Sequence, residues 1–313
     1  MIRKILKKIA YELRFDNPQY YQRISDKVFK TYYRKKLRKT LNKLKPIEFK
    51  TTPTTLTICM LSGHRHFLES VAAIYSFCAW EKNVNLHYHE DGSLKNDEIA
   101  FLEQKFKGIK IFKKADQNGI VHDFLLANQL PKSAELRKKY VFALRLFDAI
   151  IHNRSPYLLQ FDSDVLFFKK PKELLDILAN ENLKGCYNKD VVDAYTFSSE
   201  VLAKYIDKPM LRMFNCGLLL HCFEKLPFFQ YIEKIITNED ESWNSWHIEQ
   251  TLFAMYATNE GGYEQLPIVY DLARKERNRG IDITSEHYVH STGYDLHKDF
   301  LYKIYPTIKH EIG

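Results

Sequence analysis

The chain has 313 residues, of which 45% are hydrophobic and 27% charged, and its formal net charge is +8. This composition is typical of a folded chain with a full hydrophobic core, so it excludes disordered and fibrous proteins. The positive charge is concentrated, because residues 1–50 hold 16 Lys and Arg against 4 Asp and Glu, while the other 263 residues hold 31 against 35. A uniformly basic nucleic-acid-binding domain does not have this distribution, and we expect no nucleic-acid partner.

The lack of a recognisable targeting segment predicts a cytoplasmic protein. No run of 18 apolar residues occurs, and residues 1–8 alternate charged and apolar side chains, which predicts neither a membrane span nor a signal peptide. The five cysteines are an odd number without close pairs, as expected of reduced thiols.

Residues 1–50 are predicted to form a basic, amphipathic helical arm ahead of a catalytic domain at 51–313. Residues 2, 5, 6, 9 and 13 form one apolar stripe, and a second basic helical stretch runs from Tyr20 to about Leu44. The favoured interpretation is that residues 1–45 bind an anionic membrane surface, which would make the protein peripheral on the inner face of the cytoplasmic membrane. Docking of the arm onto the body or onto a second subunit is the main alternative, and nucleic-acid binding through phosphates ranks last.

Beyond the arm, strands alternate with helices. The pattern predicts strands at 56–61, 84–89, 109–112 and 157–161, and helices at 66–80, 96–106 and 138–152. Such alternation predicts an α/β fold with a mostly parallel sheet covered by helices on both faces. Ligands of these sheets bind beyond the carboxyl ends of the strands, so the turns that begin at Ser62, Glu90 and Asp162 are candidate sites.

The sharpest motif is Asp162-Ser163-Asp164, set between the apolar segments 158–161 and 165–168. Two carboxylates at a strand end are hard oxygen ligands suited to Mg²⁺ or Mn²⁺. Such an ion bridges the phosphates of a nucleoside diphosphate and neutralises charge as that group leaves. A turn with solvated carboxylates is the alternative, but two acids in so apolar a run are costly without a ligand.

The motifs, taken in order, resemble those of GT-A glycosyltransferases, closest to the glycogenin-like and lipopolysaccharide galactosyltransferase-like branch. Asp162-Ser163-Asp164 matches the Asp-x-Asp motif of that family, and residues 90–93 resemble its acidic turn after the second strand. Three later segments, 214–220, 247–253 and 289–293, resemble its Asn-x-Gly strand, its acid-Gln helix and its His-x-x-Gly segment. The resemblance covers roughly residues 55 to 300, and it implies a GT-A (Rossmann-like) fold.

The resemblance also implies roles for individual residues. The implied metal ligands for Mn²⁺ or Mg²⁺ are Asp162, Asp164 and His290. The implied donor-binding residues are Ser62, Asp91, Arg145, Asp162, Asp164, Asn215 and Lys298. Arg145 is expected to clamp the diphosphate or the sugar with its planar guanidinium, and Lys298 or His297 takes the place of the phosphate-binding Lys of the family. Glu249 and, more weakly, Asp193 are candidate bases for the acceptor hydroxyl.

These observations predict a metal-dependent glycosyltransferase of the hexosyl-transferring type. It would move a sugar from a nucleotide diphosphate donor, most simply a UDP-sugar, to a saccharide or lipid-linked acceptor. A basic arm on such an enzyme suggests surface polysaccharide or lipopolysaccharide synthesis. One alternative is a membrane-tethered, non-catalytic scaffold that has the same fold. A weaker alternative is an Asp-x-Asp phosphatase, whose motif would open the chain rather than lie in its middle.

Overall fold

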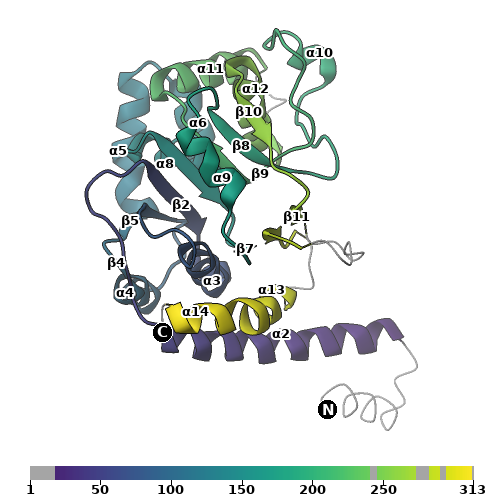
Figure 1. The fold of residues 1–313 in the computed structure, drawn as a ribbon. Coiled ribbons are helices and arrows are strands. Elements are labelled where there is room, and N and C mark those ends of the chain that lie inside the picture. The colour runs from purple at the N-terminus through teal and green to yellow at the C-terminus, as the bar shows by residue number, and fades with distance from the viewer. Residues whose placement is uncertain (1–17, 240–244, 273–281, 290–293, 312–313) are drawn as a thin grey trace.

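The computed structural model describes residues 18–239, 245–272, 282–289 and 294–311. A central, mostly parallel sheet is covered by helices on both faces (Figure 1), which confirms the predicted α/β class. In this part of the chain no helix is both long enough and apolar enough to cross a bilayer.

The central sheet has seven strands in the order β10-β8-β9-β6-β2-β3-β5. Their bounds are β2 (Leu56–Ser62), β3 (Asn85–Glu90), β5 (Lys110–Lys113), β6 (Tyr157–Phe161), β8 (Gly185–Lys189), β9 (Phe214–His221) and β10 (Tyr263–Gln265). Strands β5, β3, β2 and β6 run parallel, whereas β9 is antiparallel to both of its neighbours. The carboxyl ends of the four parallel strands and the start of β9 therefore share one edge of the sheet.

Two smaller sheets complete the β structure. Strand β12 (Ser285–His287) lies between β11 (Tyr270–Leu272), to which it is parallel, and β7 (Val165–Phe167), to which it is antiparallel. In this register His287 is opposite Val165, the residue after the Asp162-Ser163-Asp164 turn. Strand β1 (Ile47–Glu48) pairs in parallel with β4 (Phe106–Lys107).

Most of the expected helices are present, but residues 138–152 do not form the single helix that their apolar spacing predicts. The helix is interrupted there. Helix α6 ends at Lys139 and is followed by two short helices that meet at Phe147, whose backbone has φ −112° and ψ −63°. A buried ion pair across the break, between the guanidinium of Arg137 and the carboxylate of Asp148 at 2.7 Å, holds the bent path.

The helices between β2 and β6 are η1 (His64–His66), α3 (Phe67–Cys78), α4 (Asn96–Lys105), α5 (Lys114–Ala127), α6 (Pro131–Lys139), α7 (Ala143–Leu146) and α8 (Asp148–His152). Those after β7 are α9 (Lys172–Asp176), η2 (Ile177–Ala179), α10 (Ser199–Leu202), α11 (Lys225–Asn238), α12 (Ile248–Glu260), α13 (Asp295–Asp299), η3 (Phe300–Ile304) and α14 (Tyr305–Glu311).

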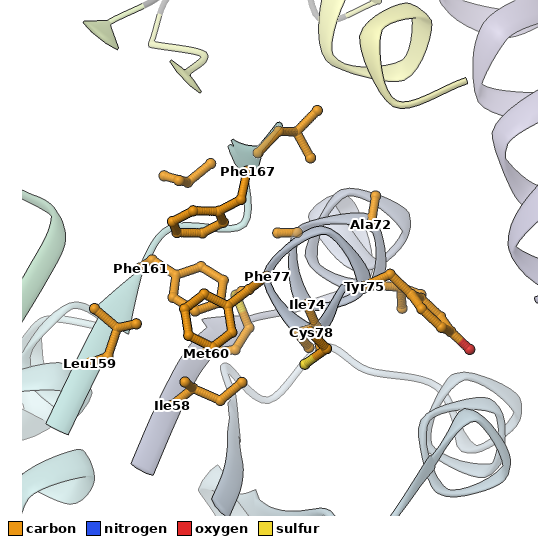
Figure 2. Packing of buried hydrophobic residues seen from close by; sticks show 14 of the residues in the cluster. Ile58, Met60, Ala72, Ile74, Tyr75, Phe77, Cys78, Leu159, Phe161 and Phe167 are labelled. Atoms are coloured by element: carbon orange, nitrogen blue, oxygen red, sulfur yellow. The ribbon is translucent and has the colours of Figure 1, made fainter. Parts of the chain in front are cut away.

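An aromatic cluster anchors the Asp162-Ser163-Asp164 turn from both sides. Phe161 ends β6, Phe167 ends β7, and both rings pack against Phe77 of α3, with ring centroids 5.9 and 5.2 Å from that ring (Figure 2). All three side chains are buried. The turn is therefore held rigidly by core packing, while the carboxylates of Asp162 and Asp164 stay partly exposed.

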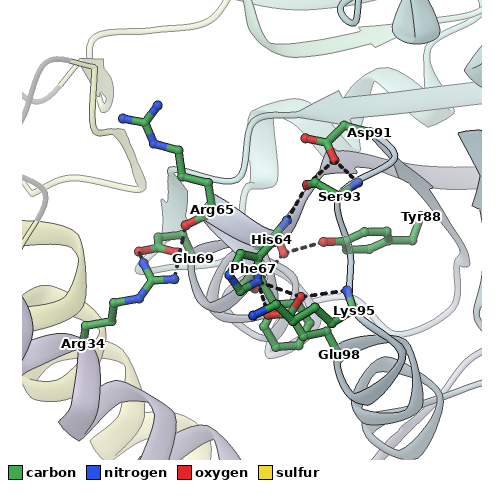
Figure 3. Close-up of polar contacts among 11 residues, drawn as sticks. Arg34, His64, Arg65, Phe67, Glu69, Tyr88, Asp91, Ser93, Lys95 and Glu98 are labelled. Carbon is green, nitrogen blue, oxygen red and sulfur yellow. Dashed lines mark hydrogen bonds and ion pairs between the residues drawn. The ribbon is translucent and has the colours of Figure 1, made fainter.

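Helix α2 (Pro18–Lys43) carries much of the basic charge and packs on the body along one face. Leu37 and Leu41 are fully buried in the core, and α13 and α14 lie along α2 (Figure 1). Arg34 donates to the carboxylate of Glu69 in α3 at 2.8 Å (Figure 3). Residues 18–43 thus dock onto the body, the alternative considered for this part of the arm, while residues 1–17 lie outside the described residues.

Three histidines lie on the far side of the sheet from α3, around Phe112 of β5. The rings of His89 and His152 both lie nearly parallel to that of Phe112, at centroid distances of 4.6 and 4.3 Å, and His87 meets its edge at 5.1 Å. Burial lowers the pKa of His87 to about 3 and that of His152 to about 4, and it lowers the pKa of His89 well below its usual value. These imidazoles are therefore neutral in the folded protein near pH 7.

Candidate active site

Two carboxylates and one imidazole converge at the carboxyl edge of the sheet. Asp162 and Asp164 follow β6, and Nε2 of His287, at the end of β12, lies 3.5 Å from Oδ2 of Asp162 and 3.2 Å from Oδ1 of Asp164. One ligand atom from each residue can be chosen so that all lie within 4.8 Å of one another. Two hard carboxylate oxygens with one imidazole nitrogen form a donor set that fits Mn²⁺ or Mg²⁺.

The electrostatics of the cluster show how strongly it attracts positive charge. Burial alone would lower the pKa of His287, but the carboxylates of Asp164 and Asp162 outweigh this effect and raise it to about 10. Burial would raise the pKa of Asp162, yet Arg145 and His287 lower it below its usual value. In the absence of a metal, a proton on His287 balances the carboxylates, and a divalent cation would replace that proton.

Sequence reasoning missed His287 and selected His290 as the third ligand. His290 lies outside the described residues. The only local signal for His287 was a second histidine three residues before His290. The pairing of β12 with β7 brings His287 to Asp164, although the two residues are far apart in sequence.

Gly217 makes room for His287. A Cβ atom on Gly217 would lie 2.1 Å from Cε1 and 2.7 Å from Nδ1 of the His287 ring, far inside van der Waals contact. The backbone of Gly217 is held by two hydrogen bonds. Its amide donates to Oδ1 of Asn215 at 2.9 Å, and its carbonyl accepts from the amide of Asp162 at 2.9 Å. The Asn215-x-Gly217 motif of β9 thus positions both the histidine and the first carboxylate.

Arg145 was expected to clamp phosphate or sugar directly, but its guanidinium is buried and engaged with the protein. Nη1 donates to Oδ1 of Asp162 at 2.8 Å, Nη2 donates to the carbonyl of Cys216, and Nε lies 3.1 Å from Oε1 of Glu249. Burial would lower the pKa of Arg145, but Glu249 and Asp162 raise it well above its usual value. Arg145 is therefore a fixed cation that orients the carboxylate of Asp162 from behind.

The two base candidates have different surroundings. Glu249, in the first turn of α12, is buried beside Arg145, and burial raises its pKa to about 7 against the opposing effect of Arg145. Asp193 lies in the loop after β8, where its two oxygens accept from Nε of Arg212 and from the amide of Met213, both at 2.5 Å. Both oxygens of Asp193 are thus engaged, whereas Glu249 contacts the residue that holds Asp162.

Two of the predicted donor-binding residues also meet at this edge. Ser62 ends β2, and its carbonyl accepts from the amide of Asp91 at 3.3 Å. The carboxylate of Asp91 lies over Gly63, where a Cβ would be 2.1 Å from its oxygens, and it accepts from the amide of Ser93 at 2.9 Å (Figure 3). The structure therefore brings Ser62 and Asp91 together on neighbouring strands.

The remaining predicted residues differ in burial and in what they contact. Asn215 donates to Oδ2 of Asp190 at 3.0 Å, beside the site, through the strand that also carries Gly217. Lys298 is exposed on α13. His297, the other phosphate candidate, is fully buried with Nε2 2.7 Å from Oε1 of Glu69, so it is not available to phosphate.

No protein-family model matches the chain, and no curated protein sequence matches it. Solved structures do match. Mouse xyloside xylosyltransferase 1, in its apo form, is 14% identical, with a TM-score of 0.51, and the match covers 78% of this chain and 98% of that one.

Two further matches are less similar in shape. An active-site mutant of LgtC is 11% identical, with a TM-score of 0.49, over 78% of this chain and 95% of that one. Core-mannan synthase A from Aspergillus fumigatus, in a Mn/GDP form, is 10% identical, with a TM-score of 0.45, over 69% and 73%. At these identities the likeness is one of fold, and it confirms that the chain has the fold of GT-A glycosyltransferases.

Proposed function

We propose that this protein is a metal-dependent glycosyltransferase that moves a sugar from a nucleotide diphosphate donor, a UDP-sugar in the simplest case, to a saccharide or lipid-linked acceptor. The observation that carries the proposal is the convergence of Asp162, Asp164 and His287 at the carboxyl edge of a GT-A sheet. The chain has the fold of glycosyltransferases, which favours this activity over the Asp-x-Asp phosphatase alternative.

Each residue has a defined task in this proposal. Asp162, Asp164 and His287 would hold Mn²⁺ or Mg²⁺, with His290 as a further candidate ligand. A cation bound there supplies positive charge to the diphosphate as the bond to the sugar breaks. Ser62 and Asp91 would bind the nucleoside, with Asn215 beside the donor sugar and Lys298 at the phosphates.

Arg145 and Glu249 act together behind the site. The Arg145 guanidinium keeps the carboxylate of Asp162 ionised and aimed at the cation position, and Glu249 holds Arg145 from its other side. A carboxylate whose pKa is near 7 is suited to accept a proton from an acceptor hydroxyl, so Glu249 is the leading base candidate and Asp193 the second. Kinetics of Glu249→Gln and Asp193→Asn distinguish them, because the variant of the base loses turnover by the larger factor, and UDP titration of each variant measures any indirect effect on the metal site.

Titration calorimetry of UDP into the purified protein, with and without Mn²⁺, tests the proposal. We expect binding that requires Mn²⁺, that Asp164→Ala abolishes, and that Asp123→Ala, which removes an exposed carboxylate on α5, leaves unchanged. Absence of UDP binding under both conditions would exclude a UDP-sugar donor, and GDP, CDP and dTDP would be titrated next. Failure of all four nucleotides would favour the non-catalytic scaffold.

We also propose that the basic segment 1–45 binds an anionic membrane surface and holds the enzyme on the inner face of the cytoplasmic membrane, as surface-polysaccharide synthesis would require. Support comes from α2, where Leu37 and Leu41 face the core while the cations Lys27, Lys30, Lys35, Arg38, Lys39 and Lys43 are exposed. Cosedimentation with phosphatidylserine vesicles should be strong at low salt and weak at high salt, and pure phosphatidylcholine vesicles should not bind. Equal recovery with both kinds of vesicle would contradict this proposal.

A further inference from the structure

One aromatic side chain near the site is unusually exposed. Trp246 precedes α12 and is 75% exposed, the largest value among the large hydrophobic residues in the described part of the chain. Its ring is packed edge-to-face against Phe142, which precedes α7, with centroids 4.7 Å apart and planes at 72°. The contact holds the indole against Phe142 while most of its surface stays in water, so its free face is available to a ligand, whose binding would bury apolar surface.

The exposed pair Phe142–Trp246 comes from the same two chain segments as the buried ion pair Arg145–Glu249. Phe142 and Arg145 are joined by a turn, since the amide of Arg145 donates to the carbonyl of Phe142 at 2.9 Å. Trp246 likewise lies one turn before Glu249, where the amide of Ile248 donates to the carbonyl of Ser245 at 3.2 Å. The same two segments therefore meet twice: at depth through Arg145 and Glu249, and at the surface through Phe142 and Trp246. Arg145 contacts Asp162, so the exposed pair is connected to the candidate metal site through Arg145 and Glu249.

The helix that follows Trp246 also holds a polar loop. The loop after β8 docks on the first turns of α12, because Nε2 of Gln250 donates to the carbonyl of Ala194 at 3.1 Å and the amide of Thr196 donates to Oγ1 of Thr251 at 2.8 Å. This loop carries the carboxylates of Asp190 and Asp193. An exposed aromatic ring matches the apolar C–H face of a pyranose, and polar groups of the kind this loop carries match its hydroxyl rim.

We propose that Trp246, supported by Phe142, is a stacking platform for a pyranose ring of the acceptor saccharide. The assignment to the acceptor rests on the proposed function, since the donor is expected at the turns after β2, β3 and β6. The acceptor then approaches over the α7 and α12 border, on the side of the site where Glu249 lies. The platform makes the preferred acceptor a saccharide, rather than the bare headgroup of a lipid.

Binding of the full-length protein to an array of immobilised pyranose oligosaccharides tests the platform directly. We compare the wild type with Trp246→Ala, with the conservative Trp246→Phe, and with Ile268→Ala, which removes another exposed apolar side chain (61% exposed). For the saccharides that the wild type binds, Trp246→Ala should lose about tenfold in affinity, Trp246→Phe should retain most of it, and Ile268→Ala should not change it. Thermal melting of each variant confirms that it is folded, and UDP titration with Mn²⁺ should be the same for all four proteins.

The outcomes separate the platform from the proposed function. The platform is overturned if the wild type binds none of the saccharides, if Trp246→Ala binds them as the wild type does, or if Trp246→Ala only shifts sedimentation towards a smaller species, which would identify an interface between copies of the chain. If none of UDP, GDP, CDP and dTDP binds while saccharide binding still depends on Trp246, the platform stands and the transferase proposal falls.

Discussion

The close approach of Gly217 to His287 makes a quantitative prediction for Gly217→Ala. The added Cβ would lie 2.1 Å from Cε1 of His287 and 2.8 Å from Oδ1 of Asn215. Carbon atoms pack no closer than about 3.5 Å, so the imidazole must move by roughly 1.4 Å. His287 is buried and cannot swing into solvent, so we expect a loss of about 1–3 kcal/mol in the free energy of unfolding, which is typical of overpacking.

The same displacement should weaken the metal site. His287 would be pushed out of line with Asp162 and Asp164, and we expect Mn²⁺-dependent UDP affinity to fall at least about tenfold. Urea unfolding measures the stability change, and titration calorimetry measures the affinity.

Two further variants make the interpretation specific. Gly119→Ala in α5 adds a Cβ that meets nothing within 4 Å, so it should be neutral or stabilising by about 0.5–1 kcal/mol. In the double variant Gly217→Ala/His287→Ala the clash with the imidazole is absent and only the contact with Asn215 remains, so its two stability changes should not add. Unchanged stability and UDP affinity in Gly217→Ala, or strictly additive changes in the double variant, would refute this reasoning.

Three other substitutions have defined outcomes. Phe77→Ala should cost about 3–5 kcal/mol in urea unfolding, because it empties the aromatic cluster that anchors the metal-binding turn; a loss under 1 kcal/mol would show that the cluster is not well packed. Arg137→Ala should cost about 3–5 kcal/mol by leaving the carboxylate of Asp148 buried without its partner, and full stability would contradict a buried pair. Stability should fall as the pH drops below about 6.5, by up to about 1.4 kcal/mol per pH unit for each buried neutral histidine, because unfolding frees imidazoles that then bind protons. His89→Phe should flatten this slope in urea unfolding between pH 7 and 5.5, and a slope equal to that of the wild type would refute the assignment.

Local sequence determined most of the secondary structure and the first half of the site. Alternating strand and helix patterns placed β2, β3, β5 and β6 correctly. The clearest are β2 and β6, because residues that are buried on both faces of a parallel sheet leave a mainly apolar run. Asp162 and Asp164 were recognisable for the same reason, since two charges inside such a run need a ligand. The prediction of one uninterrupted helix over 138–152 was wrong, because apolar spacing does not indicate where a buried ion pair such as Arg137–Asp148 bends the chain.

Only the tertiary structure decided what completes the site. The pairing of β12 with β7 brings His287 to the carboxylates. Its imidazole fits there because Gly217, in a third strand, has no side chain. Arg145 was visible as a charge in an apolar helix, but its role follows from the burial that turns its guanidinium towards Asp162 and Glu249. Two of these contacts, His287 with Asp164 and Arg145 with Glu249, join residues more than a hundred positions apart, and no short-range pattern encodes a distance between side chains that only folding brings together.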